Sequence, residues 1–518
     1  MSTAFRTHTC GELRPSDIGA RVTLGGWVHR RRDHGHLAFF DLRDRHGITQ
    51  VVTSADDAPD AHAAADPARN EWVVQVEGVV RARPDGTTNA ELATGEIEVA
   101  VDRFVVLNPS KVPPFYVNEE QPGLDESLRL KHRYLDLRRP PMQRRMLLRS
   151  RLASSIRHAL EDEGFVEIET PTLIRSTPEG ARDFVVPSRL RPGEFYALPQ
   201  SPQQLKQLLM VAGYDRYYQL AHAYRDEDMR GDRQPEHTQV DLEMSFVTEE
   251  DVMSTVERVV TRVAKEVLPD RPILAEPFPR LTYAEAMDRY GSDKPDIRFG
   301  MELVDLSDTV REVDFRVFSE PLAAGGAVFG ITAPGCGDYS RKQLDELIDL
   351  AKRHGAKGLV HLGVQAGGAL HGPAAKFLEG REAALGSAMG AGEGDLVLIV
   401  ADADRHAAAE ALGHVRVAMG DRLGMRQPGV LGYVWVHRFP MYTWDEEGGR
   451  WDATHNPFSA PVPEDLPLLD SDPGAARAQQ YDLALNGWEC GGGSVRIHQR
   501  ELLEKSFALM GHTIEGMR

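Results

Sequence analysis

Short apolar runs and turn residues alternate through the first 107 residues of the chain. The runs span residues 21–29, 37–42, 48–53, 71–83 and 95–107. Two of the turns read Asp-Arg-His-Gly and Pro-Asp-Gly, which are typical of connections between strands. Five short strands in this order predict an N-terminal β-barrel of the oligonucleotide-binding type (OB-fold), although five strands also fit other small barrels.

Helical spacing replaces the strand pattern after a proline-bearing linker at 108–142. A helix is predicted at about 143–163, because leucine or isoleucine recurs every four residues before Gly164. The recurring residues are Leu148, Leu152, Ile156 and Leu160. A strand-like segment at 165–169 follows, and a second helix is predicted at 203–211.

Two strands joined by a highly charged loop are predicted at 216–225 and 239–246. Alternate residues of a strand share one face, so Gln239, Asp241 and Glu243 point to one side and the apolar residues between them point to the other. A sheet with an apolar back and a polar face indicates a site for a polar ligand. The alternative is a hairpin face that is exposed to solvent.

Residues 292–427 differ from the flanking segments in composition and pattern. They are rich in glycine and alanine and alternate between strand-like and helix-like segments. This indicates an α/β domain inserted into another domain, whose pattern resumes at 432–439. The overall prediction is an α+β protein of several domains. Its parts are the barrel at 1–107, the linker at 108–142, a catalytic domain divided between 143–291 and 428–518, and the insert at 292–427.

Composition places the chain among globular proteins, with 41% hydrophobic and 27% charged residues. No apolar run is long enough to span a membrane, and the N-terminus lacks the features of a signal peptide. The three cysteines, Cys10, Cys336 and Cys490, lack the spacing of a zinc site and suit a reducing compartment. We therefore expect a cytoplasmic location and no membrane partner.

The net charge of −19 does not exclude a nucleic-acid partner, because binding requires only a local basic surface. One basic cluster occupies 29–32, and a second lies at 129–139. Trp27, Phe39 and Phe40 lie close to the first cluster, and single-stranded bases bind by stacking on aromatic rings beside cations. The alternatives are a solvated charged face and ordinary core aromatics.

Five further segments together resemble a known family. Residues 165–171 (FVEIETP) and 224–239 resemble motifs 1 and 2 of class II aminoacyl-tRNA synthetases. Three segments resemble those specific to the bacterial-type aspartyl enzymes of subclass IIb, namely 177–183 (TPEGARD), 200–206 (QSPQQLK) and 491–498 (GGGSVRIH). The resemblance covers essentially the whole chain and implies a class II antiparallel-sheet catalytic domain with a GAD-type insert.

The resemblance implies an aspartate–tRNA ligase, which uses ATP and Mg²⁺ to form an aspartyl-adenylate and then transfers aspartate to tRNA. Two anions meet in the first step, so fixed positive charge is needed more than an acid or base. By the family's pattern Arg225 is the catalytic residue and bridges the aspartate carboxylate and the α-phosphate. The remaining residues implied to bind ATP are Glu227, Gln234, His237 and Glu489, and Asp482 and Glu489 are implied to hold Mg²⁺.

The resemblance also implies an aspartate site. Arg496 and Lys206 are implied to bind the side-chain carboxylate, so a neutral asparagine would leave buried cations uncompensated. The other implied ligands of aspartate are Glu179, Gln203, Arg225 and His455.

The barrel is implied to bind the anticodon, with Phe39 stacking on a base and Arg30 and Gln50 as further RNA contacts. His34 resembles the histidine of non-discriminating enzymes, which charge both tRNA(Asp) and tRNA(Asn). Motif 1 implies a homodimer.

The sequence departs from the family in two places. The third motif, a glycine-rich segment that closes with Gly-Leu-Asp-Arg, does not occur, and His237 stands where phenylalanine is expected. We therefore expect an incomplete polypeptide that binds ATP poorly. Two alternatives remain open, a sibling enzyme for asparagine or lysine and a catalytically inactive tRNA-binding paralogue.

Overall fold

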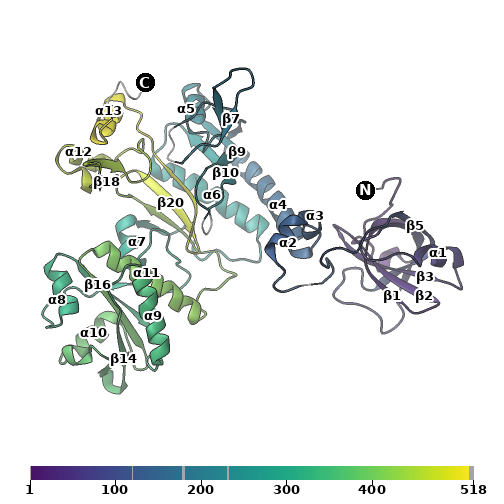
Figure 1. Ribbon diagram of the computed structural model, residues 1–518, viewed down its shortest axis with the longest axis horizontal. Helices are drawn as coiled ribbons and strands as arrows, with labels where there is room; N and C mark the ends of the chain where they lie inside the picture. Colours follow the sequence, from purple (N-terminus) through teal and green to yellow (C-terminus); the bar gives the residue numbers. More distant parts are fainter. Residues whose placement is uncertain (1, 120, 178–180, 230–232, 513–518) are drawn as a thin grey trace. The chain divides into compact units, whose positions relative to one another are not determined.

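The computed structural model describes residues 2–119, 121–177, 181–229 and 233–512 (Figure 1). The chain forms two compact units, Met1–Arg151 and Leu152–Arg518. Each unit contains its own hydrophobic cores. None of the helices in these described ranges is long and apolar enough to cross a bilayer.

Unit 1 is built around a closed barrel with the strand order β1-β2-β3-β5-β4 (Figure 1). The strands are β1 (Arg21–Asp33), β2 (Leu37–Asp44), β3 (Gly47–Ser54), β4 (Val73–Ala82) and β5 (Ile97–Asn108). The barrel prediction is confirmed. Strand β1 extends four residues beyond its predicted end, because its arginine-rich end pairs with β2 from Arg30↔Asp41 to Asp33↔Ala38. The alanine-rich helix α1 (Pro59–Ala65), which packs against β5 and β3, was not predicted.

Two carboxylates organise the linker helices of unit 1, which are α2 (Glu126–Lys131), α3 (Arg133–Asp136) and the first part of α4 (Pro140–Asp162). The fully buried Asp136 accepts hydrogen bonds from Arg129, Arg133 and Arg139. Glu71 lies 2.9 Å from Arg43 and 2.8 Å from Arg138. Much of the second basic cluster is therefore neutralised within the fold and offers little free charge to nucleic acid.

Two sheets carry the candidate chemistry of unit 2. The first has the order β10-β9-β6, and the second has the order β11-β17-β20-β21. Their strands are β6 (Val166–Glu167), β9 (Arg216–Tyr224), β10 (Glu236–Met244), β11 (Arg280–Thr282), β17 (Tyr433–His437), β20 (Gln480–Leu485) and β21 (Trp488–Ser494). Strand β10 begins three residues earlier than predicted, because Glu236, His237 and Thr238 continue the ladder with β9.

Helices cover these sheets and position the loops between them. Helix α6 (Glu249–Val267) packs against Tyr433, Trp435, Tyr481 and Leu483, which form one face of the second sheet. Helix α7 (Tyr283–Tyr290) packs on the opposite face. The remaining elements are β7 (Val185–Pro187), β8 (Phe195–Ala197), α5 (Gln203–Val211), β18 (Tyr442–Asp445), β19 (Arg450–Ala453), α12 (Leu468–Ser471) and α13 (Arg500–Leu509).

The inserted segment is a sheet between two helical layers (Figure 1). Its strand order is β12-β13-β16-β14-β15, and every pairing is antiparallel. The strands are β12 (Val304–Asp305), β13 (Ala327–Ala333), β14 (Val360–Val364), β15 (Leu370–His371) and β16 (Leu396–Asp402). Helices α9 (Arg341–Arg353) and α11 (Arg405–Arg422) pack on one face, and α8 (Arg316–Ala323) and α10 (Glu382–Met389) pack on the other.

The first sheet does not bury its apolar face and expose its polar face, as the predicted pattern implies. Val240 is 40% exposed, whereas Asp241 on the opposite, polar face is 7% exposed. Helix α5 causes this inversion, because it packs over the polar face and buries Lys206 against Asp241. The polar face is therefore the interior of a site.

Candidate functional site

A buried ammonium group lies at the centre of the site in unit 2. Helix α5 begins after Pro202 and presents Gln203 and Lys206 on one buried face, at 7% and 6% exposure. The Lys206 Nζ lies 2.7 Å from Asp241 Oδ1 and 3.3 Å from Glu243 Oε2, both on β10. One lysine thus faces two carboxylates, so the pocket can accept a further cationic group as well as an anion.

Arg496 approaches this cluster from the segment after β21. Its Nη2 donates to Gln203 Oε1 at 2.9 Å, and its Nη1 donates to Ser494 Oγ at 2.7 Å and Asn456 Oδ1 at 3.2 Å. The guanidinium carbon lies 5.0 Å from the centre of the Phe458 ring. These contacts hold the planar donor group in one orientation, which suits the recognition of a carboxylate.

Buried polar atoms of Gln203 and Asp241 have no hydrogen-bond partner in the described part of the chain. They are Gln203 Nε2, a donor, and Asp241 Oδ2, an acceptor. Buried polar atoms are nearly always paired in a folded protein, so unpaired ones indicate the position of a ligand. A donor and an acceptor that flank fixed cations fit a small molecule with both an ammonium group and carboxylates.

Four of the five predicted ATP ligands lie at the end of the β9–β10 hairpin, and the fifth, Glu489, lies on β21. Arg225 directly follows β9 and is partly buried, whereas Glu227 and Gln234 are exposed in the connecting loop. Burial and the neighbouring positive charge of Arg225 lower the pKa of His237 on β10. A neutral imidazole beside a guanidinium can pack against an aromatic base without adding charge.

The two predicted metal ligands, Asp482 and Glu489, lie on the paired strands β20 and β21. Burial, together with the charges of Glu489 and Asp293, raises the pKa of Asp482 to about 8. A β-carbon added to Gly492 would lie only 2.3 Å from Asp482 Oδ1, so the glycine leaves room for this carboxylate.

Nowhere in the described ranges do three histidine, cysteine or acidic side chains converge as metal ligands. Two carboxylates nevertheless suit Mg²⁺, which takes one or two protein carboxylates and completes its shell with phosphate oxygens and water.

Replacement of Asp482 by asparagine is expected to stabilise the ligand-free protein most at alkaline pH. The wild-type pKa is raised from 3.8 to about 8, so the stabilising contribution of the protonated carboxyl is complete below about pH 4 and is lost as the pH rises through 8. Asparagine does not titrate. The measurement is the Tm of both proteins in EDTA at pH 6 and pH 9, and an equal difference at the two pH values would contradict the expectation.

The other predicted residues of this unit are placed differently. His455 packs edge-on against Phe439 with 5.0 Å between ring centres, and desolvation lowers its pKa. Glu179 lies outside the described residues. Among the predicted ligands of aspartate, the structure brings Gln203, Lys206 and Arg496 into direct contact with one cluster.

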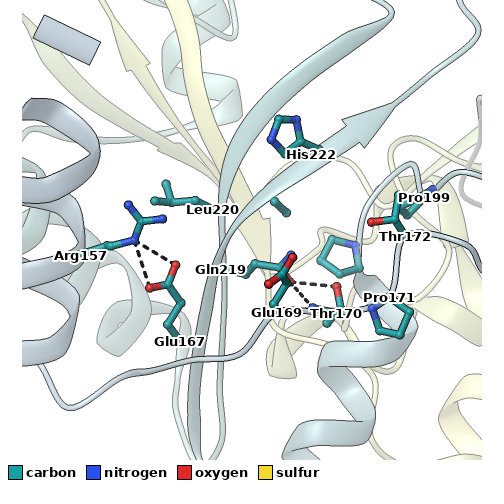
Figure 2. A pocket seen from close by; sticks show the side chains of 12 residues that line it. Arg157, Glu167, Glu169, Thr170, Pro171, Thr172, Pro199, Gln219, Leu220 and His222 are labelled. Atoms are coloured by element: carbon teal, nitrogen blue, oxygen red, sulfur yellow. Dashed lines mark hydrogen bonds and ion pairs between the residues drawn. The ribbon is translucent and has the colours of Figure 1, made fainter. Parts of the chain in front are cut away.

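The cavity along β9 does not coincide with this cluster. It has a volume of about 560 Å³ and lies between β9 and the segment Glu169–Thr172, which follows β6. Figure 2 shows Arg157 paired with Glu167 at one side and Gln219 bonded to Thr170 at the other. None of the predicted site residues lines it, and its wall is the segment that resembles motif 1.

The barrel brings most of its predicted RNA contacts to one outer face. Pairing of β1 with β2 places Arg32 opposite Phe39 and Arg30 opposite Asp41. Pairing of β2 with β3 places Gln50 of β3 opposite Asp41. The exposed His34 packs edge-on against Phe39 with 5.6 Å between ring centres.

Two observations limit which groups of this face are free. Gln50 is 7% exposed and both ends of its amide are engaged, by Arg32 at 3.0 Å and by Glu98 at 2.7 Å. The charges of Arg31 and Arg32 are also balanced, since Arg31 pairs with Asp33 and Asp66 and Arg32 pairs with Asp41.

Several residues of these sites were not selected from the sequence. In unit 2 they are Asp241, Glu243, Asn456, Phe458 and Ser494, and in the barrel Arg32. Strand alternation had already placed Asp241 and Glu243 on the polar face, and Lys206 on the preceding helix, α5, was the signal that could have identified them. The contacts of Asn456, Phe458 and Ser494 arise only in the folded chain.

Comparison with protein families gives two matches. Residues 125–517 match the model described as tRNA synthetases class II (D, K and N), and residues 22–107 match the model of the OB-fold nucleic acid binding domain. The second range agrees with the closed barrel of unit 1.

Individual relatives extend over nearly the whole chain. The Aspartate--tRNA(Asp/Asn) ligase of Moorella thermoacetica is 55% identical over 514 residues, which are 99% of this chain and 85% of the relative. The Aspartate--tRNA ligase of Geobacillus kaustophilus is 51% identical, over 99% of this chain and 86% of the relative.

Solved structures of eukaryotic proteins share the fold at low identity. Entamoeba histolytica asparaginyl-tRNA synthetase in complex with asparaginyl-adenylate superposes with a TM-score of 0.57 at 17% identity, covering 98% of this chain and 88% of that chain. Aspartyl tRNA synthetase from the same organism has a TM-score of 0.56 at 17% identity, covering 96% and 80%.

Proposed function

The chain belongs to the class II tRNA synthetases of the aspartate, lysine and asparagine group, and from this premise we propose which residues perform its reaction. It is an aspartate–tRNA ligase that uses ATP to attach L-aspartate to tRNA. One observation above all supports aspartate as the amino acid that this member of the group selects. Lys206 contacts Asp241 of β10, and Arg496 contacts Gln203, so the two cations meet in one cluster. Two fixed cations fit the side-chain carboxylate of aspartate and do not fit the neutral amide of asparagine.

The first step joins the α-carboxylate of aspartate to the α-phosphate of ATP, and pyrophosphate leaves. Arg225, which is fixed at the end of β9 by its backbone hydrogen bond to Pro235 O at 2.8 Å, would bridge the two reacting groups. Its fork of donors holds both anions in line and offsets their repulsion. His237 would pack on the adenine, and Glu227 and Gln234 would contact the nucleotide from the loop.

Asp482 and Glu489 would hold Mg²⁺ beside the phosphates. The bound ion would supply positive charge for the leaving pyrophosphate. The raised pKa of Asp482 supports this assignment, because such a carboxyl gains most from a nearby cation.

Aspartate would lie with its side-chain carboxylate toward Arg496 and Lys206. Asp241 adds a role that the sequence did not suggest, since its Oδ2 is buried, unpartnered within the described chain and able to accept from the α-ammonium group. His455 is proposed to contact the same ligand. Glu179 keeps its predicted role as an ammonium ligand on grounds of sequence alone.

We propose a homodimer that forms through the segment resembling motif 1. Large apolar side chains of unit 2 are exposed on α4 and on the segment that follows it, namely Leu152, Val166 and Leu173 at 39–53% exposure. A second copy of the chain would cover these side chains and close the cavity along β9.

The barrel is proposed to bind the anticodon of both tRNA(Asp) and tRNA(Asn). Phe39 would stack on a base, with the exposed His34 beside it and Arg30 and Gln50 at the edge. Arg30 suits this role better than Gln50, whose amide is already engaged. The domain boundaries predicted from the sequence, and a cytoplasmic location, belong to the same proposal.

The deciding experiment is charging of purified tRNA(Asp) and tRNA(Asn) with labelled aspartate. Comparable rates with both tRNAs are expected. Charging of tRNA(Asp) alone would favour the second candidate, a discriminating enzyme, which the name of the Geobacillus relative supports. The inactive-paralogue alternative finds no support among relatives that are named as ligases.

Replacement of His34 by leucine is expected to lower charging of tRNA(Asn) about tenfold more than charging of tRNA(Asp), because the variant cannot form a side-chain hydrogen bond beside the stacked base. The measurement is kcat/KM for each tRNA. The control is His36→Leu, since His36 is 82% exposed and lies two residues away. Equal losses with both tRNAs would remove His34 from tRNA selection.

A further inference from the structure

A buried side-chain amide joins residues 181–183 to the segment that leads into helix α5. The amide belongs to Gln200, which is 2% exposed. It bonds the backbone of Ala181 in both directions, since Ala181 N donates to Gln200 Oε1 at 3.0 Å and Gln200 Nε2 donates to Ala181 O at 2.8 Å. The same Nε2 donates to Asp183 Oδ1 at 2.6 Å. The amide therefore pairs with residues 181–183 as a neighbouring strand would.

Backbone hydrogen bonds on either side of this amide join both segments to the end of β9. Pro199 O, directly before the glutamine, accepts from Tyr224 N at 2.9 Å. Arg182 O accepts from Asp226 N at 3.0 Å, and these two residues form an isolated antiparallel bridge. Tyr224 and Asp226 flank Arg225 in the chain. Together with the amide, these contacts form a closed ring of hydrogen bonds that includes the backbone of Arg225.

The ring connects the two halves of the proposed active site. On one side the chain continues from Gln200 into α5, which presents Gln203 and Lys206 to the aspartate pocket. On the other side is Arg225, the proposed bridge between aspartate and ATP. Both N–H donors of the Gln200 amide are engaged within the protein, so this residue fits a positioning role and not direct contact with a substrate.

We propose that Gln200 is a positioning residue that couples the aspartate pocket to the ATP-contacting end of the β9–β10 hairpin through residues 181–183. The inference deepens the proposed function and rests on it. A contiguous hydrogen-bond network that a different ligand contacts at each end can carry coupling between the two sites. Each substrate should then raise the affinity of the protein for the other by the same factor. Asp183 supports the ring, because its second oxygen accepts from Ser176 Oγ at 2.5 Å.

The test measures the Kd for aspartate by calorimetry, with and without an ATP analogue that has a methylene group between the α- and β-phosphates and cannot release pyrophosphate. In the wild-type chain we expect the analogue to tighten aspartate binding about tenfold, and in Gln200→Met about twofold or less. The Kd for aspartate alone should stay close to the wild-type value, because Gln203, Lys206 and Arg496 are unchanged. Titration of the analogue with and without aspartate should give the same factors.

An exchange of donor and acceptor provides the second variant. Gln200→Glu removes both donors and places a second carboxylate against Asp183, so it should lose the coupling as well. Gln200→Glu combined with Asp183→Asn restores one donor–acceptor pair between the two side chains and should recover part of the coupling. A purely structural role for the amide predicts a lower Tm and weaker binding of each substrate alone, with the coupling factor unchanged.

The matched control is Thr332→Val in the insert, where the threonine hydroxyl donates to Met389 O at 2.9 Å. This variant also loses a hydrogen bond from a side chain to the backbone, so its Tm should fall while the coupling factor stays at the wild-type value. Wild-type coupling in Gln200→Met, or a wild-type chain that binds both ligands independently, would overturn the inference alone. A wild-type chain that binds neither aspartate nor the analogue would overturn the proposed function and the inference with it.

Discussion

Replacement of Arg225 by alanine is expected to lower the rate of aspartate-dependent ATP–pyrophosphate exchange about 10³-fold, the loss typical of an arginine that stabilises a phosphoryl-transfer transition state. The residue directly follows β9, where its backbone amide donates to Pro235 O at 2.8 Å. Because the two reactants are both anions, a neutral side chain leaves their repulsion uncompensated. The loss should appear mainly in kcat, since Lys206, Arg496 and the proposed metal ligands would still bind the separate substrates.

Two further variants complete the test, one that separates the contribution of charge from that of geometry and one control. Arg225→Lys keeps the charge but not the planar fork, so it should recover only part of the lost rate. Arg191→Ala is the matched control, because this surface arginine is 74% exposed and pairs only locally with Glu194 at 3.4 Å. Exchange at the wild-type rate in Arg225→Ala would remove this residue from the chemistry.

The second large effect is expected from Arg496→Leu, with a loss of about 10³-fold in kcat/KM for aspartate. Removal of a charged group that pairs with a buried carboxylate costs several kcal/mol, and about 1.4 kcal/mol corresponds to a factor of ten. Most of this loss should be a higher KM for aspartate, with direct ATP binding unchanged. Preference for aspartate over asparagine should fall as well, because the variant lacks one of the two cations that are proposed to select against the amide.

Arg500→Ala serves as the control for this variant. Arg500 lies four residues further along the chain, is 76% exposed and pairs with Glu504 at 2.7 Å. A structural explanation for the effect of Arg496→Leu predicts a lower Tm and weaker ATP binding, so both should be measured. If aspartate binding survives in this variant, the carboxylate lies elsewhere in the pocket.

The sequence pattern was sufficient to predict the helices and strands that depend mainly on local interactions. The predicted helix at 203–211 matches α5 residue for residue, and the helix predicted at 143–163 corresponds to α4. The barrel strands were found for the same reason, since turn residues separate most of them. The errors in the predicted strand bounds concentrate where charged or polar residues continue a β-ladder. These places are Arg30–Asp33 of β1 and Glu236–Thr238 of β10.

Long-range contacts explain what the sequence could not predict. The hydrogen bond from Arg496 to Gln203 joins residues 293 positions apart, and no periodicity relates them. The burial of Asp241 could not be predicted for a similar reason. The polar face of β10 becomes interior only when α5 packs over it.

The barrel's internal ion pairs bear on how a tRNA could be held and released. Arg31, Arg32 and Arg43 already contact carboxylates of their own unit, at 2.7, 3.0 and 2.9 Å. An RNA phosphate that engages them releases condensed cations from the RNA, but it also displaces an acidic side chain, which can then take up a cation, so the net gain from counterion release is small. Affinity should then depend on ionic strength less steeply than the number of arginines suggests. In its proposed role, the barrel would then distinguish RNAs by their bases more than by their charge.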